Sequence, residues 1–181
     1  MKYKLCFLFL FVNLSAFAKE TLLYKTWDDL AGHHEVTFTR GDLASDEFGG
    51  GKYLIVEQKT GAHLDWHLKD YLTECDTDKI LDLANGSVEF KDVFNDGVMT
   101  VLFAYGIGCV GGIDAVDLKY FAYHNGIKYS LRGEENLVVS NDDNKNDKPK
   151  NPVPDYNLRT TKPLLSYMIN KWPLISVRKL P

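Results

Sequence analysis

The stretch that decides the fold is residues 74–133, which read ECDTDKILDLANGSVEFKDVFNDGVMTVLFAYGIGCVGGIDAVDLKYFAYHNGIKYSLRG. It contains Cys75 and Cys109, with a turn signal at residues 95–97 (NDG) between them. Residues 98–107 (VMTVLFAYGI) are almost continuously apolar, which is typical of a central strand covered on both faces. We therefore expect a β-core pinned by one Cys75–Cys109 disulfide.

The pair Asn125-Gly126 is the strongest local signal in the chain, because it favours the type I′ turn of a two-residue β-hairpin. Opposite residues of the two arms then have numbers that sum to 251. One face of this hairpin is apolar, and we expect it to lie in the core. It carries Leu118, Tyr120, Ala122, Ile127, Tyr129 and Leu131.

The other face of the hairpin mixes cations with aromatic rings. Lys119 opposes Arg132, which is unfavourable alone, and Asp117 and Glu134 lie diagonally to them. A balanced charge cluster is one interpretation, and a cationic spot for an anionic sugar or phosphate is the other. The candidate ligand or partner surface comprises Lys119, Phe121, Tyr123, Lys128 and Arg132.

The N-terminus has the pattern of a secretory signal peptide. A short basic start precedes an apolar run (residues 5–14), and residues 16–18 (AFA) provide a cleavage site. The run is shorter than the roughly 20 residues of a membrane-spanning helix, and Cys6 lies inside it rather than at a lipidation point. We expect residues 1–18 to be removed, which leaves residues 19–181 as a single β-rich globular domain without a membrane span.

Charge and cysteine usage agree with export. Loss of Lys2 and Lys4 from the 21 basic side chains leaves 19 against 25 acidic ones, a formal charge of −6. No basic block is present, which argues against nucleic acid and anionic membrane surfaces as partners. The charge suits a cationic protein partner or serves solubility alone.

The two cysteines of the mature chain are expected to pair, because an exported protein meets an oxidising compartment. The bridge closes a loop of 34 residues (75 to 109), for which the chain-entropy relation gives about 3.5–4 kcal/mol. The competing interpretation, a catalytic thiol beside a histidine, needs a free cysteine. No C-x-x-C redox pair is present.

Elsewhere, residues 35–39 and 52–59 are predicted strands, and residues 62–72 are another strand or a short helix. Residues 41–51 form a loop whose three consecutive glycines (residues 49–51) lack the lysine and helix start of a phosphate-binding loop. We expect a brief helical turn within residues 76–85.

The C-terminal part adds the only long helix that we expect. Residues 141–154 are polar and contain three prolines, which predicts a solvated, mobile loop. Thr161 then caps a helix with Pro163 in its first turn and apolar residues at helical spacing, and Pro173 ends it. The expected fold class is α+β, mainly antiparallel β-sheet with a C-terminal helix.

Two weak metal candidates are present. His63 and His67 share a face of a helix or a strand, but no third ligand is nearby, and His33-His34 sits in an expected turn. Asp92 and Asp96 belong to half of a calcium loop, in which Phe94 replaces an oxygen ligand, so we favour a structural turn. We expect neither a metal nor another cofactor.

The order of motifs in the central segment matches a known pattern. It comprises an acidic cysteine turn (residues 74–76), a Gly/Asp turn (residues 92–97), an apolar strand ending in tyrosine and cysteine (residues 101–109), and a hairpin that begins at Leu118-Lys119 and ends at residues 128–133. This segment, roughly the middle third of the chain, resembles a family of small exported bacterial proteins labelled surface polysaccharide biosynthesis proteins. The chain departs from the family's fuller acidic turn at Phe94 and Thr100. It also departs from the family's acidic-serine-proline sequence after the second cysteine, where residues 113–115 read IDA.

The resemblance implies an exported cell-envelope protein and no catalytic residues. No serine lies in a nucleophile elbow, and we expect a non-catalytic binding protein, periplasmic or secreted, linked to surface polysaccharide biogenesis. Its partner would be a protein or an envelope glycan. The first alternative is a periplasmic immunity protein that inhibits a secreted antibacterial toxin. The third is an envelope glycan hydrolase, whose carboxylate pair would converge only in space.

Overall fold

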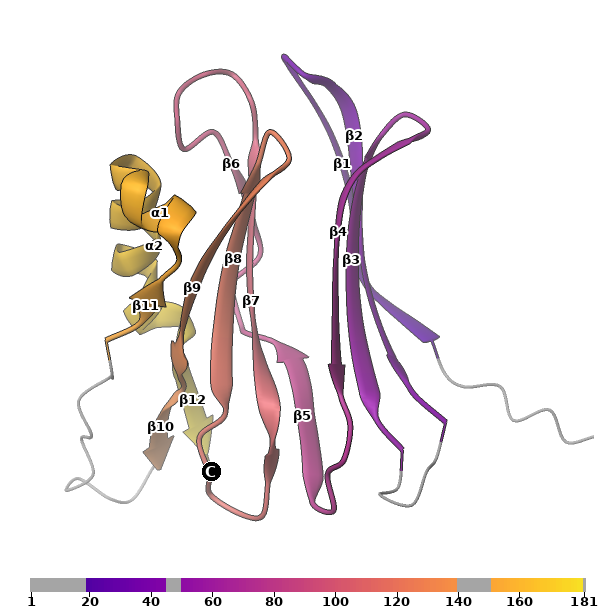
Figure 1. Ribbon diagram of the computed structural model, residues 1–181, viewed down its shortest axis with the longest axis vertical. Helices are drawn as coiled ribbons and strands as arrows, with labels where there is room; N and C mark the ends of the chain where they lie inside the picture. Colours follow the sequence, from indigo (N-terminus) through magenta and orange to yellow (C-terminus); the bar gives the residue numbers. More distant parts are fainter. Residues whose placement is uncertain (1–18, 45–49, 140–150, 181) are drawn as a thin grey trace, which may run out of the picture.

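The computed structural model describes residues 19–44, 50–139 and 151–180. The predicted signal peptide (residues 1–18) and residues 141–150 of the predicted mobile loop lie outside the described residues. The described chain forms three layers (Figure 1): a four-stranded sheet, a six-stranded sheet and two helices. The functional residues discussed below lie in and between the two sheets.

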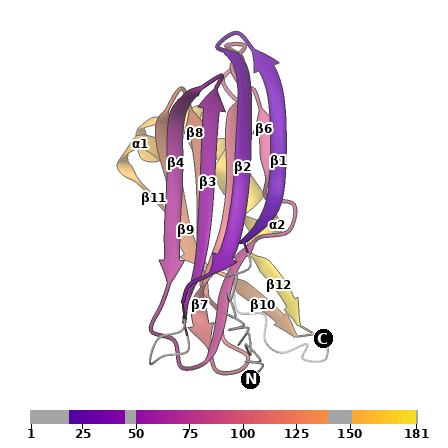
Figure 2. The ribbon, with the colours of Figure 1, turned by 90° about the vertical axis from the view of Figure 1, so that its right-hand side faces the viewer.

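The four-stranded sheet, sheet A, is an antiparallel meander in the order β1-β2-β3-β4, seen face-on in Figure 2. Its strands are β1 (Lys19–Asp29), β2 (Gly32–Asp42), β3 (Lys52–Thr60) and β4 (His63–Leu72). The strands predicted at residues 35–39 and 52–59 are confirmed within β2 and β3. The open choice for residues 62–72 is decided in favour of a strand, because alternate side chains such as Trp66 and Leu68 are buried against the other sheet.

The six-stranded sheet, sheet B, has the order β11-β9-β8-β7-β5, and β6 also pairs with β7. Its strands are β5 (Asp78–Leu83), β6 (Glu89–Lys91), β7 (Thr100–Val110), β8 (Asp117–His124), β9 (Ile127–Glu134) and β11 (Val153–Pro154). The helical turn predicted within residues 76–85 is wrong. This segment forms β5, because its pairing with β7 buries Leu81 completely between the sheets.

The central strand β7 is covered on both faces, as its apolar run predicted. Val101, Phe103 and Tyr105 lie in the core between the sheets, where Phe103 meets Phe38 of β2 edge to face at 5.1 Å. Leu102 and Ala104 lie in a second core, beneath the helices. A single strand therefore contributes to two hydrophobic cores.

The β8–β9 hairpin has the predicted register, in which Tyr120 faces Leu131 and Lys119 faces Arg132. Asn125 and Gly126 have φ angles of 48° and 73°, as a type I′ turn requires. The predicted apolar face is buried under the helices, except for Ile127 beside the turn, which is 49% exposed.

The third layer consists of α1 (Tyr156–Thr160) and α2 (Lys162–Ile175), which pack on the outer face of sheet B. Thr161 occupies the N-cap position of α2, but its hydroxyl donates to the carbonyl of Asn157 (2.9 Å) instead of capping the helix. In the described part of the chain, neither helix has the length and apolar character needed to span a bilayer.

Pro173 does not end α2, and the expectation that it would was wrong. The helix continues to Ile175, two residues beyond the proline. Proline removes one backbone donor there and its ring crowds the carbonyl of the preceding turn, a cost of about 3 kcal/mol that the burial of Trp172 and Ile175 against sheet B offsets. After the helix, β12 (Val177–Leu180) pairs in parallel with β10 (Asn136–Val139).

The Cys75–Cys109 disulfide is confirmed, with Cα atoms 5.7 Å apart. Cys75 lies in the connection between sheet A and sheet B and is 1% exposed, whereas Cys109 lies near the end of β7. The bridge therefore ties the crossover between the two sheets to the central strand of sheet B.

Candidate functional site

Three cations line the second face of the β8–β9 hairpin, and we call Lys119, Lys128 and Arg132 the cationic strip. Lys119 reaches across to β4, where its Nζ lies 2.5 Å from Asp70 Oδ2, and the Tyr105 hydroxyl donates to the same oxygen at 2.7 Å. Burial raises the pKa of Asp70, but these hydrogen bonds lower that pKa by more, so it lies below its usual value. Sheet A therefore neutralises one cation of the strip.

Lys128 and Arg132 lie one strand further out, on β9, and both are exposed. In the part of the chain that the structure describes, neither forms an ion pair with a carboxylate. Lys128 Nζ lies 4.5 Å and Arg132 Cζ 6.0 Å from the centre of the Phe121 ring. Partial burial of its side chain lowers the pKa of Lys128, and the nearby charge of Arg132 lowers it further. An anion bound beside Lys128 would raise that pKa again.

Two of the five residues predicted for this surface are not on it. Phe121 and Tyr123 are 1% and 4% exposed and lie in the core between the sheets. The prediction treated the hairpin face as open to solvent, whereas sheet A covers the β8 half of it, and on the β9 half Lys128 and Arg132 are exposed while Ser130 between them is buried. The candidate surface therefore consists of the cationic strip, which lies at the edge of the aromatic core between the two sheets.

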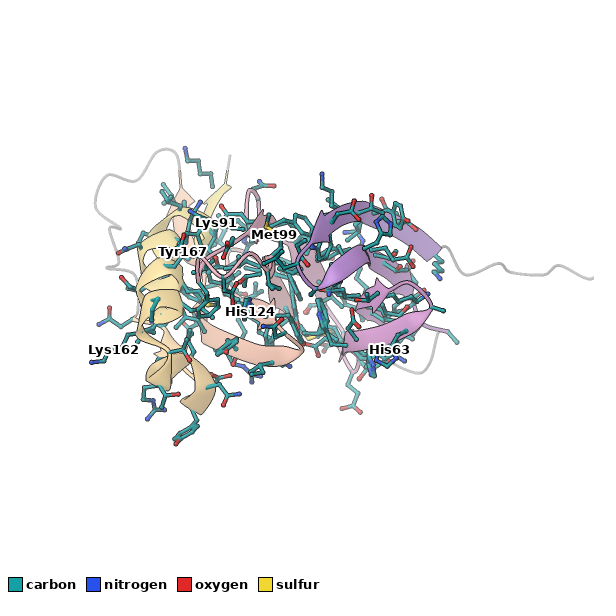
Figure 3. The ribbon with its side chains drawn as sticks, turned by 90° about the horizontal axis from the view of Figure 1, so that it is seen from above. His63, Lys91, Met99, His124, Lys162 and Tyr167 are labelled. Carbon is teal, nitrogen blue, oxygen red and sulfur yellow. A yellow bond between two sulfur atoms is a disulfide. The ribbon has the colours of Figure 1, made fainter. Side chains whose placement is uncertain are left out.

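A pocket of about 460 Å³ opens where the sheets turn at one end of the molecule, and we call it the turn-end pocket. The β1–β2, β3–β4 and β8–β9 turns surround it, and Figure 3 looks down on this end, with His63 in the layer of sheet A and Met99 in that of sheet B. Its polar and aromatic lining includes Asp29, His34, Gln58, Thr60, Asp65, Trp66 and Tyr123.

Asp29 anchors this end of the fold, although its carboxylate is only 3% exposed. The carboxylate accepts four hydrogen bonds, from Ala31 N (2.8 Å), Met99 N (2.9 Å), Trp27 Nε1 (3.1 Å) and His34 Nε2 (3.0 Å). Burial raises the pKa of Asp29, but the hydrogen bonds outweigh burial and leave that pKa lowered. Because Met99 immediately precedes β7, Asp29 ties sheet A to sheet B.

The polar side chains of the pocket are held in fixed orientations. His34 Nδ1 lies 2.8 Å from Thr60 Oγ1, which donates to Asp65 Oδ2 at 2.6 Å. Gln58 Nε2 donates to the same Asp65 oxygen at 3.2 Å, while Gln58 Oε1 accepts from Trp66 Nε1 at 2.9 Å. The other oxygen of Asp65, Oδ1, has no hydrogen bond from any described residue.

A β-bulge explains how Asp65 comes to face the pocket. Lys59 pairs with Leu64 and Gln58 pairs with Trp66, so Asp65 is the extra residue of β4. In a regular strand Asp65 and Trp66 would point to opposite faces, whereas the bulge allows both to line the same pocket.

The series Asp29–His34–Thr60 has the order of a carboxylate–histidine–hydroxyl triad, in which the histidine takes the hydroxyl proton. Here the Thr60 hydroxyl donates to Asp65 Oδ2, so its single proton is directed at a carboxylate, while His34 Nδ1 lies 2.8 Å from the same hydroxyl oxygen. Asp29, with its lowered pKa, also has the opposite character to a general acid of a glycan hydrolase. The hydrogen bonds of this arrangement fix the orientation of the polar groups that line the pocket.

The four weak metal candidates do not form a metal centre. His63 and His67 are exposed on β4, and among the described residues no group of three or more His, Cys, Asp or Glu side chains is placed to hold an ion. Asp92 accepts the backbone N–H groups of Asp96 (3.1 Å) and Gly97 (2.9 Å). Asp92 therefore holds the backbone of this segment in a hydrogen-bonded turn.

Sequence reasoning missed the turn-end pocket. It assigned His34 to a turn and gave no role to Asp29, Gln58, Thr60 or Asp65. The available signal was the placement of polar residues on both sides of two successive turns, DDLAGHH and QKTGAHLD. No protein-family model, curated protein or solved structure matches this chain.

Proposed function

We propose that the protein is an exported, non-catalytic binding protein of the cell envelope that holds an acidic glycan on the cationic strip. The observation that carries the proposal is the position of Lys128 and Arg132, two exposed cations on one face of β9 without a described carboxylate partner. The chain as a whole has a formal charge of −4. Unpaired cations on an acidic protein create a local field of the opposite sign, which attracts an anion.

The spacing of the cations favours an extended ligand over a small ion. Lys128 and Arg132 are four residues apart on one strand, which corresponds to roughly 13 Å. Arg132 also lines a depression of about 280 Å³ together with Lys119 and with the carboxylates of Asp117 and Glu134. A chain with carboxylates or phosphates at intervals can contact both ends of the strip at once, which one small anion cannot do.

The Cys75–Cys109 disulfide supports export, because disulfides persist mainly in oxidising compartments. The resemblance of the central segment to exported polysaccharide-related proteins supports a role in the cell envelope. Glycan binding by cations at the edge of a sheet needs no catalytic group.

The test is a binding titration with oligogalacturonate as the acidic glycan and a neutral maltooligosaccharide of similar length as the comparison. We expect binding of the acidic glycan alone, weakened by added salt because exposed charges are screened. The double variant Lys128→Gln/Arg132→Gln should bind at least tenfold more weakly. Lys162→Gln removes an exposed cation from the helical layer (Figure 3) and should leave binding unchanged. Equal binding by the double variant, or equal binding of the neutral glycan, would refute the proposal.

A further inference from the structure

We propose that the turn-end pocket is a second binding site, which takes one neutral ring of hexose size and rejects an acidic one. The inference rests on the geometry of the pocket alone and does not require any ligand on the cationic strip. It concerns residues of both sheets, mainly Asp65, Tyr123 and Trp66.

The size and walls of the pocket fit a single small ring. Its volume of about 460 Å³ lies within the usual range of small-molecule sites, roughly 300–1,000 Å³. One wall is apolar and formed by Trp66, Val98 and Met99. Trp66 is fixed in place, because it stacks on Tyr123 with ring centroids 3.7 Å apart and its indole N–H donates to Gln58. A sugar ring likewise has apolar C–H faces and a polar hydroxyl rim.

Asp65 supplies a hydrogen-bond acceptor that no described residue uses. Its side chain is 20% exposed and lines the pocket. Oδ2 already accepts from Thr60 and Gln58, which fixes the carboxylate plane and leaves Oδ1 for a ligand hydroxyl. Hydrogen bonds from a hydroxyl to a carboxylate are about twice as strong as those between neutral groups.

Tyr123 supplies a second polar group of the opposite kind. The residue is 4% exposed and lines the pocket, yet its hydroxyl has no hydrogen-bond partner in the described chain. The hydroxyl reaches the pocket and is therefore available to hydrogen-bond a ligand there. Burial raises the pKa of Tyr123, which keeps its hydroxyl protonated and able to donate.

The charges around the pocket exclude an acidic ring. Asp29 and Asp65 both line it, whereas its described lining contains no lysine or arginine and has only the histidines His34 and His63 as possible cations. A ligand carboxylate would face the unpaired oxygen of Asp65 at close range, where like charges repel strongly in a partly buried site. The turn-end pocket therefore selects against the acidic groups that the cationic strip attracts.

The experiment is an NMR titration of the oxidised, mature chain with glucose, galactose and mannose, and with the corresponding uronates. The indole N–H signal of Trp66 reports on the pocket. The indole N–H of Trp172, buried in the other core without a hydrogen-bond partner, serves as the internal control. We expect at least one neutral hexose to shift the Trp66 signal but not that of Trp172, with its uronate at least tenfold weaker.

Two variants separate binding from folding. In Asp65→Asn, the hydrogen bonds from Thr60 and Gln58 keep the amide oxygen at the Oδ2 position, so an NH₂ group replaces the free acceptor. This variant should bind the hexose at least tenfold more weakly while its melting temperature stays close to that of the wild type. Tyr123→Phe removes only the unpaired hydroxyl and should weaken binding several-fold.

The matched control is Asp28→Asn, which neutralises an exposed carboxylate (80% exposed side chain) beside the β1–β2 turn and should bind like the wild type. The inference is overturned if no neutral hexose shifts the Trp66 signal, if a uronate binds as well as its hexose, or if Asp65→Asn retains full affinity. None of these results depends on Lys128 or Arg132, so they leave the proposed binding of acidic glycans to its own test.

Discussion

Replacement of Asp29 by asparagine tests whether a single buried carboxylate holds the two sheets together at the turn end. The carboxylate accepts four hydrogen bonds, whereas an amide of the same shape has one acceptor oxygen and an NH₂ group. Two of the four donors therefore lose their acceptor and face another N–H group. At about 1.5–2.5 kcal/mol for each hydrogen bond to a charged group, the loss of two is roughly 3–5 kcal/mol.

The assay is urea unfolding of the wild type and Asp29→Asn, followed by tryptophan fluorescence at two pH values. At about pH 7 the variant should be less stable by roughly 3–5 kcal/mol, which corresponds to a melting temperature lower by about 10 °C for a chain of this size. The lowered pKa of Asp29 means that its stabilising effect is present above the unfolded pKa and is lost as the pH falls through the folded pKa. The difference between the two proteins should therefore shrink towards about pH 2.

The result that would refute this reasoning is a difference in stability that stays the same at both pH values, because a purely steric effect does not titrate. Asp28→Asn is the matched control, since its side chain is 80% exposed and pairs only with exposed His33. We expect it to change stability by less than about 0.5 kcal/mol at either pH.

Two further predictions concern the disulfide and the helical layer. The double variant Cys75→Ser/Cys109→Ser releases a 34-residue loop and should lower the free energy of unfolding by about 3–4 kcal/mol in urea; equal stability of the oxidised wild type and the variant would contradict the role given to the bridge. Met168→Ala opens a cavity in the fully buried core under α2 and should cost about 2–5 kcal/mol, whereas Ile169→Ala, next to it but 40% exposed, should cost under about 1 kcal/mol; similar losses for both would mean that α2 packs on another face.

The structure bears out the local predictions that rest on strong backbone chemistry. The turn at Asn125-Gly126 set the register of β8 and β9 without error, because both residues accept the positive φ that the turn requires. The continuous apolar run of residues 98–107 correctly indicated a strand buried on both faces. The failures occurred where tertiary contacts outweighed local preference, as at β5 and at Pro173.

The candidate sites show the same division. The cations of the strip were found from the register alone, but the burial of Phe121 and Tyr123 was not, because only the docking of sheet A decides which half of that face is covered. The turn-end pocket was missed, since Asp29 and Met99 are 70 residues apart and meet only when the sheets pack. Asp65 was missed because a bulge reverses the face on which it lies.

By itself, the sequence determined the hairpin register, the β-rich class, the pairing of the two cysteines and the helix at the C-terminus, because each follows from backbone preference or from periodicity along one segment. Only the tertiary structure decided which hairpin face is covered and which polar residues meet at the turn end. The physical reason is that burial and hydrogen bonding between sheets depend on how distant segments pack, and alternation within a strand contains no information about the opposing layer.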